Sequence, residues 1–147
     1  MEGKWCFMGI TENKKVFYLF YNRAWNLGDA TVVDDLVAPN FVNHEIEGTT
    51  TQSHRELYKQ GIIETYKAFP DWTTTFDGII AELDKVVLQW QAQGTHTGEG
   101  MGEPSGKQFH YVGISIACIV DGKITEFWKK DNSYLVWQKH LRSSVYD

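Results

Sequence analysis

Apolar residues in the first half of the chain recur at the three- and four-residue spacing that is typical of amphipathic helices. We predict a first helix from Thr11, a residue type suited to an N-cap, to Gly28. Its apolar positions form two neighbouring lines, of which one is Val16, Leu19, Phe20, Ala24 and Leu27 and the other is Phe17, Tyr21 and Trp25. A short second helix is predicted over residues 29–37, ahead of Pro39, and a third over residues 51–69.

From residue 72 onward the apolar spacing changes to two, the period of a half-buried strand. The alternation predicts four strands, over residues 73–81, 86–96, 108–120 and 123–130. Residues 82–85 and the pair Asp121-Gly122 are turn signals between strands, and a glycine-rich loop occupies residues 98–106.

Helices that precede an antiparallel sheet indicate an α+β fold. A short strand over residues 41–45 and a closing helix over residues 133–140 complete the predicted elements. Nothing repeats and no segment resembles a linker, so we predict one domain over residues 1–147, with residues 1–10 as an N-terminal extension. We expect a curved, mostly antiparallel sheet wrapped around about three helices, a cone-shaped α+β barrel with a pocket at its open end and the glycine-rich loop at one rim. The sheet face left uncovered keeps apolar residues, which favours a homodimer.

Composition adds a reason to expect a cavity. Aromatic residues make up 14% of the chain, with 6 Trp and 7 Tyr, which exceeds what a core of this size requires and indicates an apolar pocket or an interface. The net charge of −5 argues against nucleic-acid binding, and no run of basic residues suggests a membrane patch.

The cysteines and the ends of the chain bear on the compartment. Cys6 and Cys118 form no CxxC pair, and Cys118 lies in an apolar run, so we expect no disulfide. Residues 1–10 lack the pattern of a signal peptide, and no stretch is long enough to span a membrane, so we expect a cytoplasmic protein.

Common metal and cofactor motifs are missing from the sequence. The five histidines show no HExxH spacing, no GxGxxG follows a strand, and no GxSxG elbow occurs. We therefore predict neither a metal nor a cofactor, and a small molecule as the binding partner.

Several short motifs occur together in a recognisable order. They are Trp25-Asn26-Leu27-Gly28-Asp29, Asn40-Phe41-Val42-Asn43-His44, Phe69-Pro70-Asp71, Asp84-Lys85-Val86-Val87, Gly94-Thr95-His96-Thr97-Gly98-Glu99 and Asp121-Gly122-Lys123-Ile124-Thr125-Glu126-Phe127-Trp128, followed by an Asp and a terminal helix that contains Gln138. Over residues 12–139 this order resembles the SnoaL-like polyketide cyclases of the nuclear-transport-factor-2-like superfamily. The resemblance implies a cone-shaped, usually dimeric α+β barrel. Founding members close a ring by an intramolecular aldol reaction, and relatives catalyse other cyclisations, isomerisations and rearrangements.

Asp131 is the first candidate for chemistry, because the resemblance places an acid/base aspartate just after the last strand. Burial in an apolar pocket raises the pKa of a carboxyl group, and such a group can move protons at neutral pH. Family members commonly have three residues between the Trp and this Asp, whereas only Lys129 and Lys130 separate Trp128 from Asp131. One residue fewer moves Asp131 to the other face of the strand unless a bulge compensates for it. The alternative role of Asp131 is an N-cap of the last helix.

The other polar candidates are an asparagine, a serine and three histidines. The resemblance implies a pocket position for Asn43, whose amide could hold a substrate oxygen, and neighbouring His44 could act as a base or a donor. The third-strand position where founding cyclases carry a histidine matches Ser115, so His110 or His44 replaces it or the chemistry differs. His96 belongs to the Gly-Thr-His pattern and is a catalytic or a structural residue.

Aromatic side chains are the candidates for substrate contact, although any one of them is also an ordinary core residue. They are Tyr21, Trp25, Trp90, Tyr111, Phe127 and Trp128.

The sequence thus predicts a cofactor-independent cyclase or isomerase of an apolar natural-product intermediate, polyketide- or terpenoid-like, that works by acid/base catalysis. Three alternatives stay open: a pericyclic cyclase, an epoxide-opening enzyme with paired acids such as Glu45 or Asp77 beside Asp131, and a binding domain without catalysis.

Overall fold

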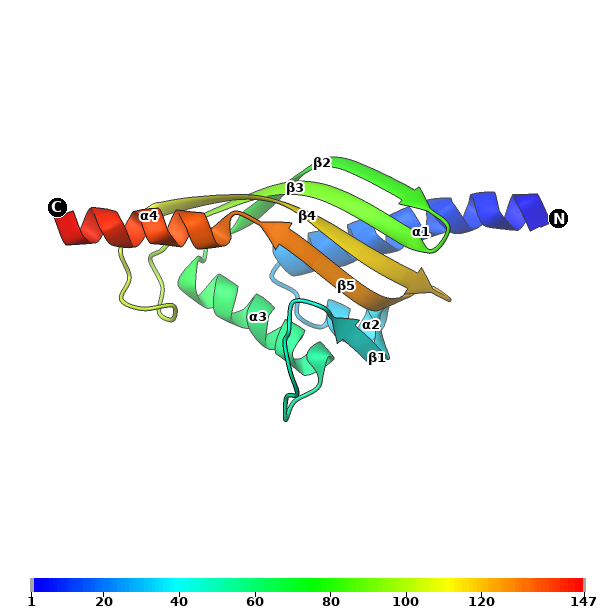
Figure 1. Ribbon diagram of the computed structural model, residues 1–147, viewed down its shortest axis with the longest axis horizontal. Helices are drawn as coiled ribbons and strands as arrows, with labels where there is room; N and C mark the ends of the chain where they lie inside the picture. The colour runs from blue at the N-terminus through cyan, green and yellow to red at the C-terminus, as the bar shows by residue number, and fades with distance from the viewer. Residues whose placement is uncertain (1, 147) are drawn as a thin grey trace.

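The computed structural model describes the chain from residue 2 to residue 146 and its side chains from residue 9 to residue 140. In this part of the chain, one curved, unclosed sheet lies over helices α1 and α3 (Figure 1). The strands are β1 (Val37–Asn43), β2 (Thr73–Glu82), β3 (Lys85–Thr95), β4 (Gln108–Val120) and β5 (Lys123–Asp131). The helices are α1 (Glu2–Trp25), α2 (Val32–Leu36), α3 (His54–Ala68) and α4 (Ser133–Tyr146). The α+β fold class is confirmed.

The strands follow the order β1-β5-β4-β3-β2, and every pair is antiparallel except β1 with β5. Four consecutive strands, β2 to β5, therefore pair with their neighbours in antiparallel order, as the alternating pattern predicts. Asp121 and Gly122 both have positive φ values, 51° and 74°, which is the geometry of the tight turn that joins β4 to β5.

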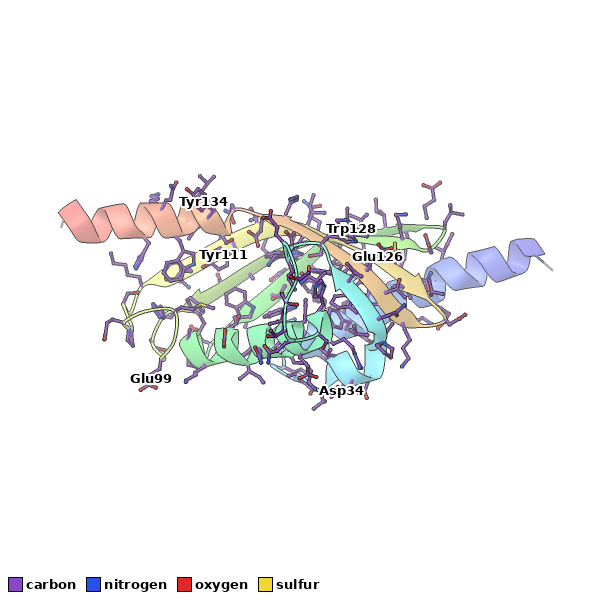
Figure 2. All side chains as sticks on the ribbon, turned by 60° about the horizontal axis from the view of Figure 1, so that its bottom comes forward. Asp34, Glu99, Tyr111, Glu126, Trp128 and Tyr134 are labelled. Atoms are coloured by element: carbon purple, nitrogen blue, oxygen red, sulfur yellow. The ribbon has the colours of Figure 1, made fainter. Side chains whose placement is uncertain are left out.

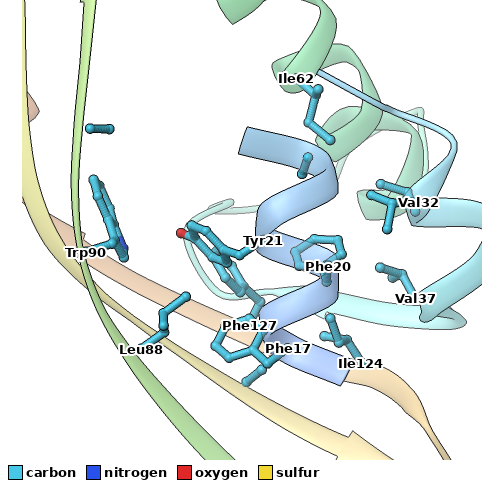
Figure 3. Packing of buried hydrophobic residues seen from close by; sticks show 14 of the residues in the cluster. Phe17, Phe20, Tyr21, Val32, Val37, Ile62, Leu88, Trp90, Ile124 and Phe127 are labelled. Atoms are coloured by element: carbon cyan, nitrogen blue, oxygen red, sulfur yellow. The ribbon is translucent and has the colours of Figure 1, made fainter. Parts of the chain in front are cut away.

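Helix α1 packs its aromatic face against the inner face of the sheet. Phe17, Phe20, Tyr21 and Ala24 are buried, and Figure 3 shows Tyr21 between Phe20 and Trp90 of β3. The first predicted apolar line of this helix is correct only in part, because Leu19 and Leu27 are exposed. The buried stripe instead combines members of both lines.

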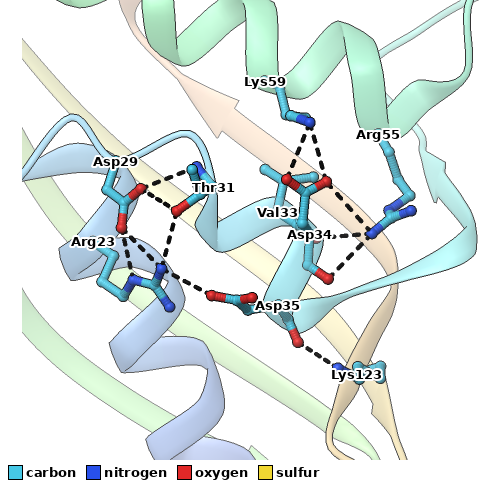
Figure 4. A network of polar contacts seen from close by, with 9 residues as sticks. All are labelled: Arg23, Asp29, Thr31, Val33, Asp34, Asp35, Arg55, Lys59 and Lys123. Atoms are coloured by element: carbon cyan, nitrogen blue, oxygen red, sulfur yellow. Dashed lines mark hydrogen bonds and ion pairs between the residues drawn. The ribbon is translucent and has the colours of Figure 1, made fainter.

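Charged side chains fix α2 between α1 and α3 (Figure 4). Arg23 of α1 bonds to Asp29 at 2.8 Å and to Asp35 at 3.0 Å, while Lys59 of α3 reaches Asp34 at 3.0 Å. These contacts hold the three helices at one edge of the sheet, and they position β1, which follows α2 directly.

Two predicted boundaries are wrong. The first helix begins at Glu2, so Thr11 lies inside it and does not cap it. The segment around Pro39 belongs to β1, which begins at Val37 and forms an edge of the sheet, because its main chain pairs in parallel with β5. A proline is tolerated in an edge strand because its missing N–H need not join the ladder.

Of the two cysteines, Cys118 is a buried free thiol on β4, and Cys6 lies outside the described side chains. Among the described helices, none is both long and apolar enough to cross a membrane.

The glycine-rich loop is anchored to the end of α3 through Gly98. Its N–H donates to the carbonyl oxygen of Ala68 at 3.0 Å, and a Cβ atom at this position would lie 1.8 Å from the carbonyl oxygen of Lys67. The loop can follow this path only because residue 98 has no side chain.

We expect Gly98→Ala to lower the free energy of unfolding by about 1–3 kcal/mol, the usual cost of forcing extra atoms into packed structure. Chemical denaturation of both proteins measures it. Gly61→Ala is the matched control, because a Cβ there meets nothing within 4 Å and alanine favours the helix. An unchanged stability of Gly98→Ala would contradict the close approach.

Candidate active site

A cavity of about 740 Å³ lies between the inner face of the sheet, the three longer helices and the glycine-rich loop. Most of its surface is apolar and aromatic. The residues that line it are Tyr21, Trp25, Asn43, Glu45, Ile46, Leu57, Tyr58, Gly61, Thr65, Phe69, Trp72, Thr74, Trp90, Ala92, Met101, Tyr111, Phe127, Lys129, Asp131, Ser133, Tyr134 and Trp137. A volume of this size fits a molecule of several fused rings.

Asp131 lies at the last position of β5 and lines this cavity. It is paired with Gly113 on β4, and only 13% of its side chain is exposed. One carboxylate oxygen accepts hydrogen bonds from the backbone N–H of Ser133, at 3.1 Å, and from its hydroxyl, at 2.7 Å. The other lies 3.5 Å from the ammonium group of Lys129. Asp131 therefore faces the cavity and also caps the start of α4. The sequence leaves a pocket residue and a helix cap open as alternatives, and in the structure Asp131 has both positions.

The charge state of Asp131 differs from the sequence-based expectation. Burial raises the pKa of this carboxyl group, but the hydrogen bonds from Ser133 and the positive charge of Lys129 outweigh burial and leave the pKa below its ordinary value. The predicted raised pKa is therefore wrong. Asp131 is ionised at neutral pH and is equipped to accept a proton.

The shortened spacing between Trp128 and Asp131 puts these two side chains on opposite faces of β5. Trp128 stacks on the imidazole of His44 outside the cavity, with ring centroids 4.4 Å apart, and His44 Nε2 lies 3.0 Å from Glu126. Figure 2 shows Trp128 and Glu126 along β5. The bulge in the β4–β5 ladder comes before Trp128, between the pairs of Cys118 and Ile119, and so does not restore the common parity. Trp128 is absent from the cavity lining because strand alternation turns it outward, and His44, in the turn directly after β1, stacks on it there.

The other two candidate histidines also lie away from the cavity surface. His110 is exposed on the outer face, where its Nε2 lies 3.0 Å from the amide oxygen of Gln91. His96 is buried under the glycine-rich loop, where Nε2 lies 3.1 Å from the Gly100 carbonyl oxygen and Nδ1 lies 3.4 Å from the Ser105 hydroxyl. The geometry of His96 is that of an anchor for the loop.

Asn43 and Glu45 line the cavity at the end of β1. The Asn43 amide oxygen accepts a hydrogen bond from the Glu45 N–H at 3.0 Å, so its NH₂ group is left to donate elsewhere. The Glu45 carboxylate accepts from the Lys129 backbone N–H at 2.7 Å and thereby continues the β1–β5 pairing beyond Asn43. Asn43 thus offers a donor on the cavity side opposite the aromatic wall of β3 and β4.

Ser115 joins two cavity aromatics at the centre of the sheet. Its hydroxyl lies 2.6 Å from the Tyr21 hydroxyl and accepts a hydrogen bond from Trp90 Nε1 at 2.9 Å. Burial raises the pKa of Tyr21 well above its usual value, so this phenol stays neutral. Ser115 itself lies behind the lining and positions Tyr21 and Trp90 without contacting the cavity.

The structure adds residues that the sequence analysis does not single out: Tyr58, Trp72, Lys129, Ser133 and Trp137. Lys129 could be predicted as a cavity residue from strand alternation alone, because every second residue of β5 points to the same face and Lys129 lies between Phe127 and Asp131 on that face. Tyr58, which accepts a hydrogen bond from Trp25 Nε1 at 2.9 Å, and Trp137 come from helices whose orientation only the packed structure reveals.

Among the side chains of residues 9–140, no three His, Cys, Asp or Glu residues gather as metal ligands would.

Comparisons with known proteins identify relatives of this chain. The profile of the family described as SnoaL-like polyketide cyclase matches residues 15–138. IdmH from Streptomyces antibioticus, a proposed polyketide cyclase, superposes with a TM-score of 0.71 at 27% identity over 86% of this chain and 96% of its own. AclR from Streptomyces galilaeus, a proposed hydroxylase, gives 0.69 at 28% identity over 83% and 79%. A proposed polyketide cyclase from Acidithiobacillus ferrooxidans gives 0.72 at 23% identity over 87% and 93%, which shows the shared fold. No protein of curated function matches the sequence.

We expect Ser115→Ala to destabilise the protein by about 1–3 kcal/mol, because it leaves the Tyr21 hydroxyl and the Trp90 N–H buried without this partner. Tyr21→Phe is the control, since it removes one member and leaves the Trp90–Ser115 bond intact. Urea unfolding should rank Ser115→Ala as the less stable variant. A Tyr21→Phe variant less stable than Ser115→Ala would contradict the role of Ser115 as the shared hydrogen-bond partner of Tyr21 and Trp90.

Proposed function

Because this chain belongs to the SnoaL-like polyketide cyclase family, we propose that it catalyses the cyclisation or isomerisation of an apolar, carbonyl-bearing natural-product intermediate by proton transfer at carbon. The observation that carries the proposal is the ionised carboxylate of Asp131 in the wall of an aromatic cavity. The cavity would hold the substrate in a reactive conformation, which raises the effective concentration of the reacting groups.

In this mechanism Asp131 removes a proton from the carbon beside a substrate carbonyl group. The electron pair of that C–H bond forms an enolate, whose oxygen accepts a hydrogen bond from the Asn43 amide. In a cyclisation, the enolate carbon then attacks a second carbonyl carbon of the same molecule, and protonated Asp131 returns its proton to the alkoxide that this attack forms. In an isomerisation, protonated Asp131 instead returns its proton to another carbon of the conjugated enolate. Either way the enzyme is regenerated.

Lys129 supports this role through its charge. Its ammonium group lies 3.5 Å from Asp131 and, like Asp131, contributes to the cavity lining. The positive charge keeps Asp131 ionised before the reaction and is close enough to stabilise negative charge on a substrate oxygen during it.

We test the proton-transfer step with 2-tetralone, a two-ring ketone small enough for the cavity, by following exchange of its α-hydrogens for deuterium in D₂O by NMR. The wild type should accelerate exchange over buffer, and Asp131→Asn should reduce this acceleration about 100-fold or more, the usual contribution of a general base. The rate should stay on its plateau until the pH falls below the range in which an ordinary aspartate titrates, because hydrogen bonds from Ser133 and the charge of Lys129 lower the pKa of Asp131.

Asp77→Asn is the matched control, because Asp77 is exposed, bonds to Gln91 at 2.9 Å and is not part of the 740 Å³ cavity. It should exchange hydrogen at the wild-type rate. Equal rates for Asp131→Asn and the wild type would refute the assigned base.

An epoxide-opening reaction is the second candidate, since a second acid, Glu45, lines the same cavity as Asp131. That chemistry needs both acids around an activated water. It predicts that Glu45→Gln impairs turnover of an epoxide as strongly as Asp131→Asn does, whereas the carbon-acid mechanism makes Asp131 dominant.

We also propose that two copies of the chain associate through the outer face of the sheet. Val112 and Ile114 lie there on β4 with 41% and 46% of their surface exposed. Sedimentation velocity should show a dimer for the wild type and a monomer for Ile114→Lys, because a charged residue opposes burial of this face. Leu83→Lys, at an exposed turn outside this face, should stay dimeric. A wild-type monomer at micromolar concentration would contradict the assignment.

A further inference from the structure

Three polar groups meet on the inner face of β4, and they carry one more hydrogen than their hydrogen bonds use. Ser115 Oγ lies 2.6 Å from the Tyr21 hydroxyl oxygen and 2.9 Å from Trp90 Nε1. Each of the three groups has one hydrogen to donate, and the two hydrogen bonds between them use two. Among the described residues, neither hydroxyl has a further partner within hydrogen-bond distance, so one hydrogen has no acceptor in the protein.

Burial decides which group keeps the unused hydrogen. An indole N–H can only donate, so Ser115 Oγ accepts from Trp90. If Ser115 also accepted from Tyr21, its own hydrogen would be left inside the sheet, because Ser115 is fully buried behind the cavity lining. A buried donor without an acceptor costs free energy, so Ser115 donates to the Tyr21 oxygen instead. The unused hydrogen is then that of the Tyr21 hydroxyl.

Packing fixes the direction of the Tyr21 side chain. Phe17 and Phe76 form T-shaped contacts with its ring, with centroid distances of 5.5 and 6.1 Å. Figure 3 shows the hydroxyl at the end of the ring that points away from α1 and toward Trp90. Unlike Ser115, Tyr21 lines the cavity, so a ligand there meets the residue that has a hydrogen to donate.

Strand register places this hydroxyl beside the base. Its partner Ser115 pairs with Lys129 on β5, and Gly113, two residues earlier on β4, pairs with Asp131. Two residues along one strand face span about 7 Å, so the Tyr21 hydroxyl lies about one such step from Asp131. Contacts of about 3 Å at either end of the α-carbon-to-oxygen unit of a ketone span a similar distance. A ketone can therefore present its α-hydrogen to Asp131 and its oxygen to Tyr21.

We propose that Tyr21 is a catalytic hydrogen-bond donor to the ketone oxygen beside the carbon that Asp131 deprotonates. This inference rests on the proposed function for the role of Asp131. Tyr21 donates from the β4 side of the cavity, whereas Asn43, the donor already assigned to this oxygen, lies on β1. Ser115 and Trp90 are positioning residues, because the hydrogen bond from Ser115 turns the Tyr21 hydrogen toward the cavity.

Tyr21 acts in this step without giving up its proton. Burial, more than the nearby charge of Asp131, raises the pKa of Tyr21 well above its usual value, so the phenol stays neutral. Negative charge develops on the ketone oxygen as the C–H bond breaks, and a hydrogen bond to a charged oxygen is stronger than one to a neutral oxygen. The Tyr21 O–H therefore stabilises the transition state more than the bound ketone.

Binding of 2-naphthol tests the donor without any turnover. Its anion has the shape and charge of the enolate of 2-tetralone, and absorbance reports how much of the bound molecule is ionised. The pKa of bound 2-naphthol should be about 1 to 2 lower on the wild type than on Tyr21→Phe, the usual effect of one hydrogen bond to a charged group. Naphthalene, which has no oxygen, should bind both proteins with equal affinity.

Tyr66→Phe is the matched control, because it removes a part-buried phenol hydroxyl that donates to the Trp72 carbonyl oxygen at 3.3 Å and does not line the cavity. It should leave the pKa of bound 2-naphthol at the wild-type value. Ser115→Ala keeps the Tyr21 hydroxyl but removes the bond that orients it, so its value should fall between those of the wild type and Tyr21→Phe. A wild-type value for Ser115→Ala would overturn the positioning role of Ser115.

The deuterium-exchange assay with 2-tetralone tests the same donor in catalysis. Tyr21→Phe should lower kcat about 10-fold or more and leave KM nearly unchanged, because the lost hydrogen bond is strongest in the transition state. A loss confined to KM would make Tyr21 a binding residue only and would contradict the proposal.

The proposal is also overturned if bound 2-naphthol has the same pKa on the wild type and on Tyr21→Phe. Its failure is distinct from failure of the proposed function. If exchange depends on Asp131 but Tyr21→Phe matches the wild type in both assays, the base is retained and the Tyr21 donor is refuted. If Tyr21 stabilises the bound anion but the wild type does not exchange the α-hydrogens of 2-tetralone, the donor is retained and the assigned catalysis is refuted.

Discussion

The pairing of Gly113 with Asp131 at the end of the β4–β5 ladder is the constraint on which the rest of the site depends. A Cβ atom on residue 113 would lie 2.4 Å from the Trp90 ring, 2.9 Å from Asp131 Cβ and 2.9 Å from the Lys130 carbonyl oxygen. Because residue 113 has no Cβ atom, the Trp90 indole and the Asp131 side chain can both pack against its backbone. Directly beyond it, Asn132 exchanges hydrogen bonds with the main chain of Val112 and ends the strand, so that α4 begins at Ser133.

This arrangement explains how a carboxylate stays charged in an aromatic wall. The turn into α4 supplies two hydrogen bonds from Ser133, and strand alternation places Lys129 on the same face two residues earlier. Both groups are fixed by the backbone near Asp131, so the charge is stabilised before any ligand binds.

Much of the fold could be predicted from the sequence because strand alternation and turn residues are local signals. The strand over residues 108–120 and the Asp121-Gly122 turn were located by periodicity and glycine alone. The site was harder to predict because it depends on parity and on packing between distant segments. Asp131 lies in the cavity as expected, but its lowered pKa comes from Ser133 and Lys129, whose positions around the carboxylate only the folded turn defines. Trp128 was a candidate for substrate contact as an aromatic residue, and His44 was a candidate as the polar neighbour of Asn43. The two-residue spacing before Asp131 already contained the evidence that Trp128 points outward.

The central claim is that Asp131 is an ionised base in the cavity wall of the free protein. The most direct measurement is a titration of its side-chain carboxyl ¹³C signal by NMR, assigned from the signal lost in Asp131→Asn. The account predicts a pKa below 3.8, because Ser133 and Lys129 stabilise the charged form. A titration midpoint near neutrality would contradict it, since Asp131 would then carry a proton under working conditions and act first as an acid.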